Sequence, residues 1–206
     1  MSTMIDIDSL DWNKSGGLLP AVVQDADNMR VLMLGYMDRQ ALQVTCGTGQ
    51  VTFFSRSRNR LWTKGETSGN TLGLVAIETD CDADSLLVRA RPQGPTCHLG
   101  RDSCFADAPG DVVAALDALV ASRVDAPADA SYTARLFAGG VRRIAQKVGE
   151  EGVETALAAV AQDDDALLGE AADLVYHLVV LLRARGLGWA DVQRVLAARS
   201  GAAPRG

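Results

Sequence analysis

The pattern of apolar and polar positions changes character part-way along the chain. Up to about residue 105, short runs of β-branched and aromatic residues are separated by polar turns, which is typical of β-strands. The runs are PAVVQD, RVLMLGYM, VTFFSR, LVAIET and SLLVRA. A helix is predicted after the second run, because Asp38 is a favourable N-cap and apolar residues follow it until Gly47 ends the pattern. We therefore expect a mostly antiparallel β domain with one helix.

From Asp111 onward the chain is rich in Ala, Leu and Val at helical spacing. The segment before it, ADAPG at 106–110, contains Pro and Gly without apolar periodicity, which favours a linker. The spacing predicts helices over 111–123, about 133–161, about 165–185 and 189–199. Their expected starts lie near Asp111, Ser131, Asp165 and Gly188. We expect an α+β chain of two domains, residues 1–110 and 111–206, the second an all-α helical bundle.

The overall charge narrows the range of partners. A net charge of −6 would repel a long polyanion over much of the surface, so nucleic-acid binding is not expected. The first residues lack the basic and apolar regions of a secretory signal, and no apolar run approaches the roughly 18 residues of a membrane span. We therefore expect a cytoplasmic protein without a membrane segment, whose cysteines are reduced thiols or metal ligands.

Acidic residues recur at helical spacing in the second half of the chain. Glu151 and Glu154 are three residues apart and share a helix face, and Glu170 and Asp173 repeat this spacing on the next predicted helix. Converging carboxylates repel each other unless cations neutralise them, and carboxylate oxygens favour hard ions such as Mg²⁺ or Mn²⁺. The alternative is that these acids are solvated or pair with nearby basic residues. The recurrence of these acids on consecutive apolar helices favours metal binding. His177, four residues after Asp173, is interpreted as a hydrogen-bonded core residue.

The same segments resemble a known enzyme superfamily. EEGVE at 150–154 and EAAD at 170–173 match the EExxE and ExxD pattern of the all-α nucleotide pyrophosphohydrolases. SYTARLF and KVGEEGVETALAA resemble phosphoribosyl-ATP pyrophosphohydrolase specifically. By this resemblance, the four paired carboxylates hold Mg²⁺, which clamps a triphosphate while water attacks and pyrophosphate leaves. The resemblance also implies that Glu150 orients that water or a ligand.

Three cysteines in the first half are candidate zinc ligands. Cys81, Cys97 and Cys104 form no CxxC pair, which argues against a structural zinc site. Three thiolates with a fourth position left for water would make a catalytic zinc site. Three buried structural thiols are the alternative, and the spacing alone does not decide between them. Cys46 follows the predicted helix and is interpreted as a structural thiol.

Two further segments of the first half carry candidate ligands. On an extended strand, Asp80, Asp82 and Asp84 would share one side and Cys81 the other, so two metals could lie near one segment. Segment 55–70 is basic and rich in Ser, Thr and Gly, which favours a phosphate-binding loop. Its basic residues are Arg56, Arg58, Arg60 and Lys64, of which Arg56, Arg58 and Lys64 are taken as substrate-binding.

These segments resemble phosphoribosyl-AMP cyclohydrolase. The matching runs are LWTKGETSGN, DCDADSLLVRARPQGPTCH and the later Cys104-Phe105. The resemblance implies Zn²⁺ held by the three cysteines, with Cys81 contributed across a homodimer interface, and Mg²⁺ held by the three aspartates. It places Glu66 and Thr67 in the substrate loop, although a turn role explains them nearly as well. His98, beside a zinc ligand, is expected either to transfer a proton or to fix that ligand.

Together the two resemblances cover most of the chain, in the order found in the fused bacterial enzyme. They imply hydrolysis of phosphoribosyl-ATP to phosphoribosyl-AMP and pyrophosphate, followed by opening of the adenine ring between N1 and C6. These are the second and third steps of histidine biosynthesis. One alternative is a housecleaning nucleotide pyrophosphohydrolase fused to a metal-binding partner. In another, the first half is a non-catalytic zinc-binding dimerisation module.

Overall fold

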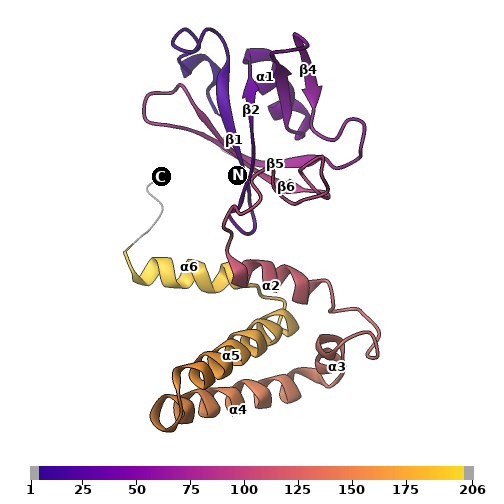
Figure 1. Ribbon diagram of the computed structural model, residues 1–206, viewed down its shortest axis with the longest axis vertical. Helices are drawn as coiled ribbons and strands as arrows, with labels where there is room; N and C mark the ends of the chain where they lie inside the picture. Colours follow the sequence, from indigo (N-terminus) through magenta and orange to yellow (C-terminus); the bar gives the residue numbers. More distant parts are fainter. Residues whose placement is uncertain (1–4, 202–206) are drawn as a thin grey trace. The chain divides into compact units, whose positions relative to one another are not determined.

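The computed structural model describes residues 5–201 of the 206-residue chain (Figure 1). The chain divides into two compact units, Met1–Asp111 and Val112–Gly206. Residues 1–4 and 202–206, at the outer ends of the two predicted domains, lie outside the described residues. No helix in the described part combines the length and apolar character needed to cross a bilayer. The predicted α+β class is confirmed, with strands in the first unit and helices alone in the part of the second unit that the structure describes.

The first unit is built on a four-stranded sheet of order β2-β1-β6-β5. These strands are β1 (Leu19–Asp25), β2 (Val31–Met37), β5 (Leu72–Thr79) and β6 (Leu86–Pro92). The outer pairs are antiparallel, but β1 and β6 pair in parallel. A separate antiparallel ribbon joins β3 (Thr52–Ser55) and β4 (Arg60–Thr63). All five predicted strands are present, whereas β4 is an additional strand inside the basic segment.

Buried and partly exposed side chains alternate along β1, and the buried ones belong to the core of this unit. Leu19, Ala21 and Val23 are fully buried, and the residues between them are only partly covered, as the two-residue period of a strand requires. The fully buried Phe53 of β3 belongs to the same core.

The helix of the first unit, α1 (Arg39–Thr48), begins where the sequence predicts. The Asp38 carboxylate accepts a hydrogen bond from the backbone N–H of Ala41 at 2.7 Å, which is the expected N-cap. The predicted stop at Gly47 is wrong. The helix continues to Thr48, and Gly49, whose φ of 70° is left-handed, ends it as a glycine C-cap. A short 3₁₀ turn (Ile7–Ser9, η1) precedes the sheet.

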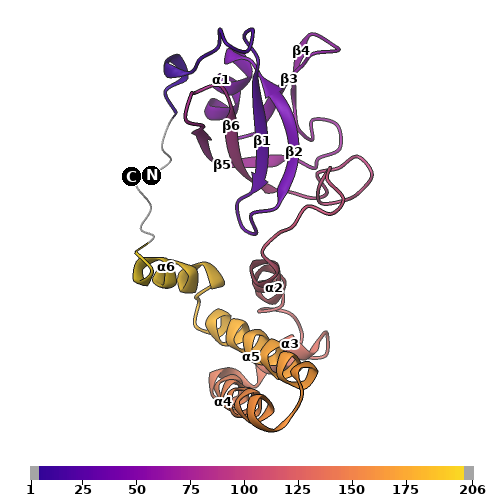
Figure 2. The same cartoon turned by 60° about the vertical axis from the view of Figure 1, so that its left-hand side comes forward.

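The second unit contains only helices among its described residues. They are α2 (Val112–Ala121), α3 (Tyr132–Ala138), α4 (Gly140–Ala161), α5 (Asp164–Ala184) and α6 (Trp189–Arg199). Figure 2 shows α4 and α5 side by side as a hairpin. A two-residue connection between them makes the pair antiparallel. This hairpin positions the acidic residues of the second unit.

The single helix predicted over about 133–161 is wrong, because the chain breaks between α3 and α4. Gly140, the first residue of α4, has a φ of +77°, which the interior of an α-helix cannot contain and which glycine adopts at little cost. Ser131 caps α3 by accepting from Ala134 N–H at 3.1 Å, as its position predicts. Asp163 caps α5 in the same way at 3.0 Å, in place of the predicted Asp165.

A partly buried ion pair ties three helices of this unit together. The carboxylate of Asp117 on α2 accepts two hydrogen bonds from the Arg183 guanidinium on α5, at 2.6 and 2.5 Å. It also accepts the backbone N–H of Trp189 at the start of α6, at 3.0 Å. Every oxygen of this buried carboxylate is therefore satisfied, which its burial requires.

Candidate active sites

A cavity of about 710 Å³ lies beside β4 and the loop that follows it. Four of the five predicted substrate-binding residues line it, namely Arg58, Lys64, Glu66 and Thr67. Cys97, His98 and Cys104 line the same cavity. The fifth predicted residue, Arg56, lies elsewhere, with its guanidinium carbon 3.8 Å from the centre of the Tyr36 ring in a separate hollow. The fold therefore brings the basic loop and two of the three cysteines to one space.

Hydrogen bonds fix the shape of the loop after β4. The Glu66 carboxylate accepts the Thr63 backbone N–H and a guanidinium N–H of Arg60, both at 3.1 Å. These two donors, the backbone N–H first, hold the pKa of Glu66 below its usual range. Lys64 is anchored by its backbone N–H to the Val51 carbonyl at 3.0 Å. Glu66 thus has a turn role and orients Arg60, which also lines the cavity.

Cys97 and Cys104 lie at the cavity on a segment anchored to β2. The Cys104 N–H donates to the Leu32 carbonyl at 2.8 Å, and the Cys97 N–H donates to the Arg101 carbonyl at 2.9 Å. The Leu99 backbone N–H, followed by the Arg101 side chain, lowers the pKa of the Cys97 thiol. Burial, and then the neighbouring Cys97, raises the pKa of Cys104. Two adjacent thiols, one of them favoured as thiolate, fit a soft cation such as Zn²⁺.

Cys81 lies apart from these two thiols. It is exposed in the turn between β5 and β6, and it does not line the cavity. Within residues 5–201 of one chain, the three cysteines do not form a three-ligand group. A zinc site made from all three cysteines therefore needs more than one chain, or a different arrangement of the turn.

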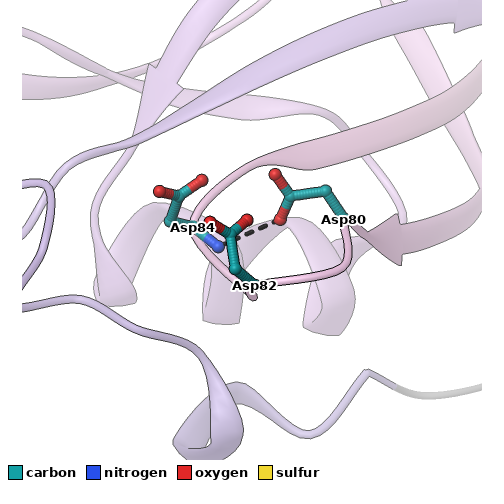
Figure 3. A group of neighbouring side chains, drawn as sticks. All are labelled: Asp80, Asp82 and Asp84. Atoms are coloured by element: carbon teal, nitrogen blue, oxygen red, sulfur yellow. Dashed lines mark hydrogen bonds between the residues drawn. The ribbon is translucent and has the colours of Figure 1, made fainter.

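Three aspartates meet in that turn (Figure 3). The extended strand predicted for this segment is wrong: Asp80 to Asp84 form a turn in which Ala83 has a left-handed φ of 59°. The Asp80 carboxylate accepts the backbone N–H of Asp84 at 3.0 Å, which closes the turn. Carboxylate oxygens of Asp80, Asp82 and Asp84 all lie within 4.8 Å of one another. Such a set of oxygens fits a hard divalent cation.

A lysine ammonium already lies on this cluster. Lys14 Nζ is 2.6 Å from an oxygen of Asp84 and also contacts the Asp82 carboxylate. The N-terminal segment is held there by the Asp11 backbone N–H, which donates to the Ala83 carbonyl at 2.8 Å. The turn therefore attracts positive charge within the chain itself.

In the second unit, α4 and α5 bring Glu151, Glu154 and Glu170 together. An oxygen of each lies within 4.8 Å of the others, and Glu151 is buried. Burial, followed by the charges of Glu151 and Glu170, raises the pKa of Glu154. This like-charge repulsion is what a divalent cation would relieve. Within the described residues the group does not include Asp173, whose side chain is exposed on α5.

The surroundings of the glutamate cluster are basic and aromatic. Lys147 Nζ lies 2.8 Å from Glu151 and 2.9 Å from Glu150, and it lowers the pKa of both carboxyl groups. His177 is buried, with Nδ1 donating to the Asp173 carbonyl at 2.9 Å and lying 3.5 Å from Glu151. Its Nε2 is 3.2 Å from the Tyr132 hydroxyl. The interpretation of His177 as a hydrogen-bonded core residue is confirmed.

Comparison with known proteins identifies both units. Residues 33–106 match the family model of phosphoribosyl-AMP cyclohydrolase, and residues 113–200 match that of phosphoribosyl-ATP pyrophosphohydrolase. The histidine biosynthesis bifunctional protein HisIE of Xanthomonas axonopodis pv. citri is 70% identical over 191 residues, 93% of each chain. The chain belongs to this family of bifunctional histidine biosynthesis proteins. It is a bifunctional hydrolase with a cyclohydrolase unit followed by a pyrophosphohydrolase unit.

Relatives of lower identity carry the same name and match over most of their length. The HisIE protein of Shewanella oneidensis is 56% identical over 205 residues, 99% of this chain and 97% of its own. That of Escherichia coli is 57% identical over 180 residues, 86% of this chain and 89% of its own. These matches support the two histidine-pathway reactions over a housecleaning pyrophosphohydrolase or a non-catalytic zinc module.

Several site residues were not predicted from the sequence. In the cyclohydrolase unit, Trp62 and Asn70 line the cavity, and Lys14 reaches the aspartate turn. In the pyrophosphohydrolase unit, Tyr132 meets His177. For Trp62 the signal was present, because an aromatic residue inside a basic, glycine-rich segment can offer a flat surface to a nucleotide base.

Proposed function

We propose that the cyclohydrolase unit opens the adenine ring of phosphoribosyl-AMP in the 710 Å³ cavity, with Zn²⁺ bound at Cys97 and Cys104. The observation that carries this proposal is the meeting of two adjacent thiols with Arg58 and Lys64 in one cavity. The thiols suit a zinc ion, and the basic residues suit the substrate phosphates. When bound, zinc lowers the pKa of water towards neutrality.

The residues of the cavity would then orient the substrate and move protons. Arg58 and Lys64 bind phosphate oxygens, and Glu66 keeps Arg60 and the loop in place. Water adds to C6 of the adenine ring, the bond between N1 and C6 breaks, and N1 takes up a proton. His98 lines the cavity and is exposed to it, so we assign this proton transfer to its imidazole. Thr67, in the loop after β4, presents its hydroxyl to the same cavity as a substrate-binding group.

The third zinc ligand in this proposal is Cys81 of the partner subunit. The turn that carries Cys81 is exposed, and its thiol is free, so a second chain can approach it. The protein would thus be a homodimer in which each zinc is shared between subunits. Asp80, Asp82 and Asp84 beside Cys81 would hold Mg²⁺, since their clustered oxygens fit that ion.

The pyrophosphohydrolase unit would act on the triphosphate of phosphoribosyl-ATP. Glu151, Glu154 and Glu170, together with Asp173, would hold Mg²⁺, which neutralises charge on the triphosphate. Lys147 contributes positive charge, and Glu150 accepts from Lys147 and Gln146, so it is fixed at the edge of the cluster. We assign Glu150 to orienting the water that replaces pyrophosphate. The bond broken joins the α- and β-phosphates.

Both reactions are proposed to take place in the cytoplasm. The four cysteines are all free thiols in the structure, and thiols stay reduced in that compartment.

Product analysis with matched variants tests these roles. Metal-loaded protein should convert phosphoribosyl-ATP into pyrophosphate and the ring-opened product. Glu154→Gln should block pyrophosphate release, because it removes one charge from the carboxylate cluster. Cys97→Ser should lose zinc and accumulate phosphoribosyl-AMP, whereas Cys46→Ser, a change outside the cavity, should retain both zinc and ring opening. Full zinc content in Cys97→Ser would contradict the assigned ligands.

A further inference from the structure

The cyclohydrolase cavity has clear places for the polar parts of its substrate but needs a flat surface for the base. The basic loop can hold the phosphate groups. The C6 atom of the adenine ring, where the reaction takes place, must lie near Cys97 and Cys104. A purine ring has large apolar faces, which proteins usually cover with an aromatic side chain. Among the described residues that line the cavity, Trp62 carries the only indole or phenyl ring.

Packing holds the Trp62 side chain in place. Trp62 on β4 is paired across the ribbon with Phe53 on β3, and their ring centroids are 5.1 Å apart. Phe53 has no exposed surface, so it is a fixed support. The next pair on the ribbon, Thr52 and Thr63, is joined by a hydroxyl contact of 2.9 Å. The indole is therefore pre-organised, which reduces the entropic cost of stacking a ligand on it.

The support of the indole extends to β2. A Cβ atom added at Gly35 would lie only 2.4 Å from the Phe53 ring, so the absence of a side chain at Gly35 makes room for Phe53. Phe53 is buried and cannot swing away. Gly35 and Phe53 are thus positioning residues that act on the cavity through Trp62.

Trp62 also has the right neighbours along the chain. It lies two residues after Arg60 and two residues before Lys64, and both of these basic residues line the cavity. A nucleotide whose phosphates are bound by the basic loop would carry its base close to the indole. We propose that the Trp62 indole stacks on the adenine ring of phosphoribosyl-AMP, an inference that rests on the proposed location of the cyclohydrolase site.

This stack would also distinguish substrate from product. Adenine substituted at N1 is electron-poor, and the face of indole is electron-rich, so their attraction exceeds that of two neutral rings. Opening the N1–C6 bond destroys the six-membered ring and removes most of the stacking surface. Trp62 thereby holds the closed ring and releases the open product.

The test compares Trp62→Leu and Trp62→Phe in the full-length, zinc-loaded protein. Base stacking on an aromatic residue is worth enough to change binding about 5- to 150-fold. Trp62→Leu should raise the KM for phosphoribosyl-AMP within that range with a smaller change in kcat, and Trp62→Phe should recover most of the loss. AMP should quench the tryptophan fluorescence of the wild type but not that of Trp62→Phe.

Phe54→Leu is the matched control, since Phe54 on the adjacent strand does not line the cyclohydrolase cavity, although Trp62 borders the hollow that Phe54 lines as well. It should leave the KM unchanged. Zinc content reports whether the cyclohydrolase unit of each variant is folded, and pyrophosphohydrolase activity reports whether the second unit is intact. An unchanged KM in folded, zinc-loaded Trp62→Leu would overturn the inference, as would an equal loss in Trp62→Phe. Failure of the wild type to open the ring, or zinc retained in Cys97→Ser, would instead overturn the proposed site.

Discussion

In each unit a lysine ammonium lies on the acidic cluster that we propose for magnesium. Lys14 contacts Asp82 and Asp84, and Lys147 contacts Glu150 and Glu151. An ammonium group and a divalent cation favour the same carboxylate oxygens, and their like charges repel each other at short distance. Metal binding at either cluster therefore has to displace the lysine or weaken its contacts.

Replacement of Lys14 by methionine should accordingly strengthen metal binding at the aspartate turn. Loss of one competing charge at an exposed site should tighten Mn²⁺ binding by about 3- to 10-fold. Electron paramagnetic resonance of Mn²⁺ can measure this in a Glu154→Gln background, in which the second cluster is weakened. Arg89→Met is the control, because Arg89 pairs with Glu78 and not with an aspartate of the turn. Equal or weaker Mn²⁺ binding in Lys14→Met would show that the lysine supports the site instead.

At the scale of single elements, the break between α3 and α4 sets where the acidic face of α4 begins. Gly140 permits the break because its φ of +77° is accessible to glycine, and a Cβ added there would meet no atom within 4 Å. The cost of a side chain at this position is therefore backbone strain alone.

Substitution of Gly140 by alanine should destabilise the pyrophosphohydrolase unit by about 1 kcal/mol, because alanine disfavours a left-handed φ. Gly149 is the matched control. It lies inside α4 with no positive φ, and its added Cβ would also meet no atom within 4 Å. Gly149→Ala should therefore stabilise the helix by about 0.5–1 kcal/mol. Urea unfolding followed by far-UV circular dichroism measures both, and the same sign of change in both variants would contradict this account.

The elements that the sequence predicted correctly are those with local causes. Asp38 and Ser131 cap their helices through hydrogen bonds to residues three positions away, so sequence alone locates them. The run from Asp163 to Asp165 offers several caps, and the structure uses the first. The doublet Gly139-Gly140 could equally have been tolerated inside a helix, so the sequence alone did not locate the break.

In the candidate sites too, contacts between residues close in the sequence were predictable, whereas contacts between distant residues were not. Glu151 and Glu154 share a face by helical spacing, so their proximity was predictable. The contact between Lys14 and Asp82 spans 68 residues, and no pattern in the sequence indicates it. Arg56 and Arg58 look equivalent in the sequence, yet only Arg58 lines the cavity, because the turn after β3 sends Arg56 towards Tyr36.

At the scale of the whole molecule, the chain carries two hydrolytic activities in two compact units. The unit that catalyses the first reaction is second along the chain. Each activity can serve as an internal control for the other, since a substitution that acts within one unit should leave the reaction of the other unit unchanged. The property to measure at this scale is the number of chains that complete one zinc site.

Mixed dimers answer that question. If Cys81 reaches the zinc site of the partner subunit, Cys81→Ser and Cys97→Ser proteins should each lack ring opening when alone. A dimer with one subunit of each kind has one complete site, formed by Cys81 of one chain with Cys97 and Cys104 of the other. Random association should therefore restore about a quarter of the wild-type sites. Co-expression with two affinity tags, followed by zinc and activity measurements, tests this.

The control pairs Cys97→Ser with Cys104→Ser. These two changes affect the same half of the site, which one chain supplies through a single anchored segment. Every site in such a mixture is incomplete, so no ring opening should return, although pyrophosphate release should stay at the wild-type level in all mixtures. If tandem affinity purification recovers mixed dimers of Cys81→Ser and Cys97→Ser without activity, Cys81 is not shared. The aspartate turn that carries it would then have no direct part in the partner's zinc site.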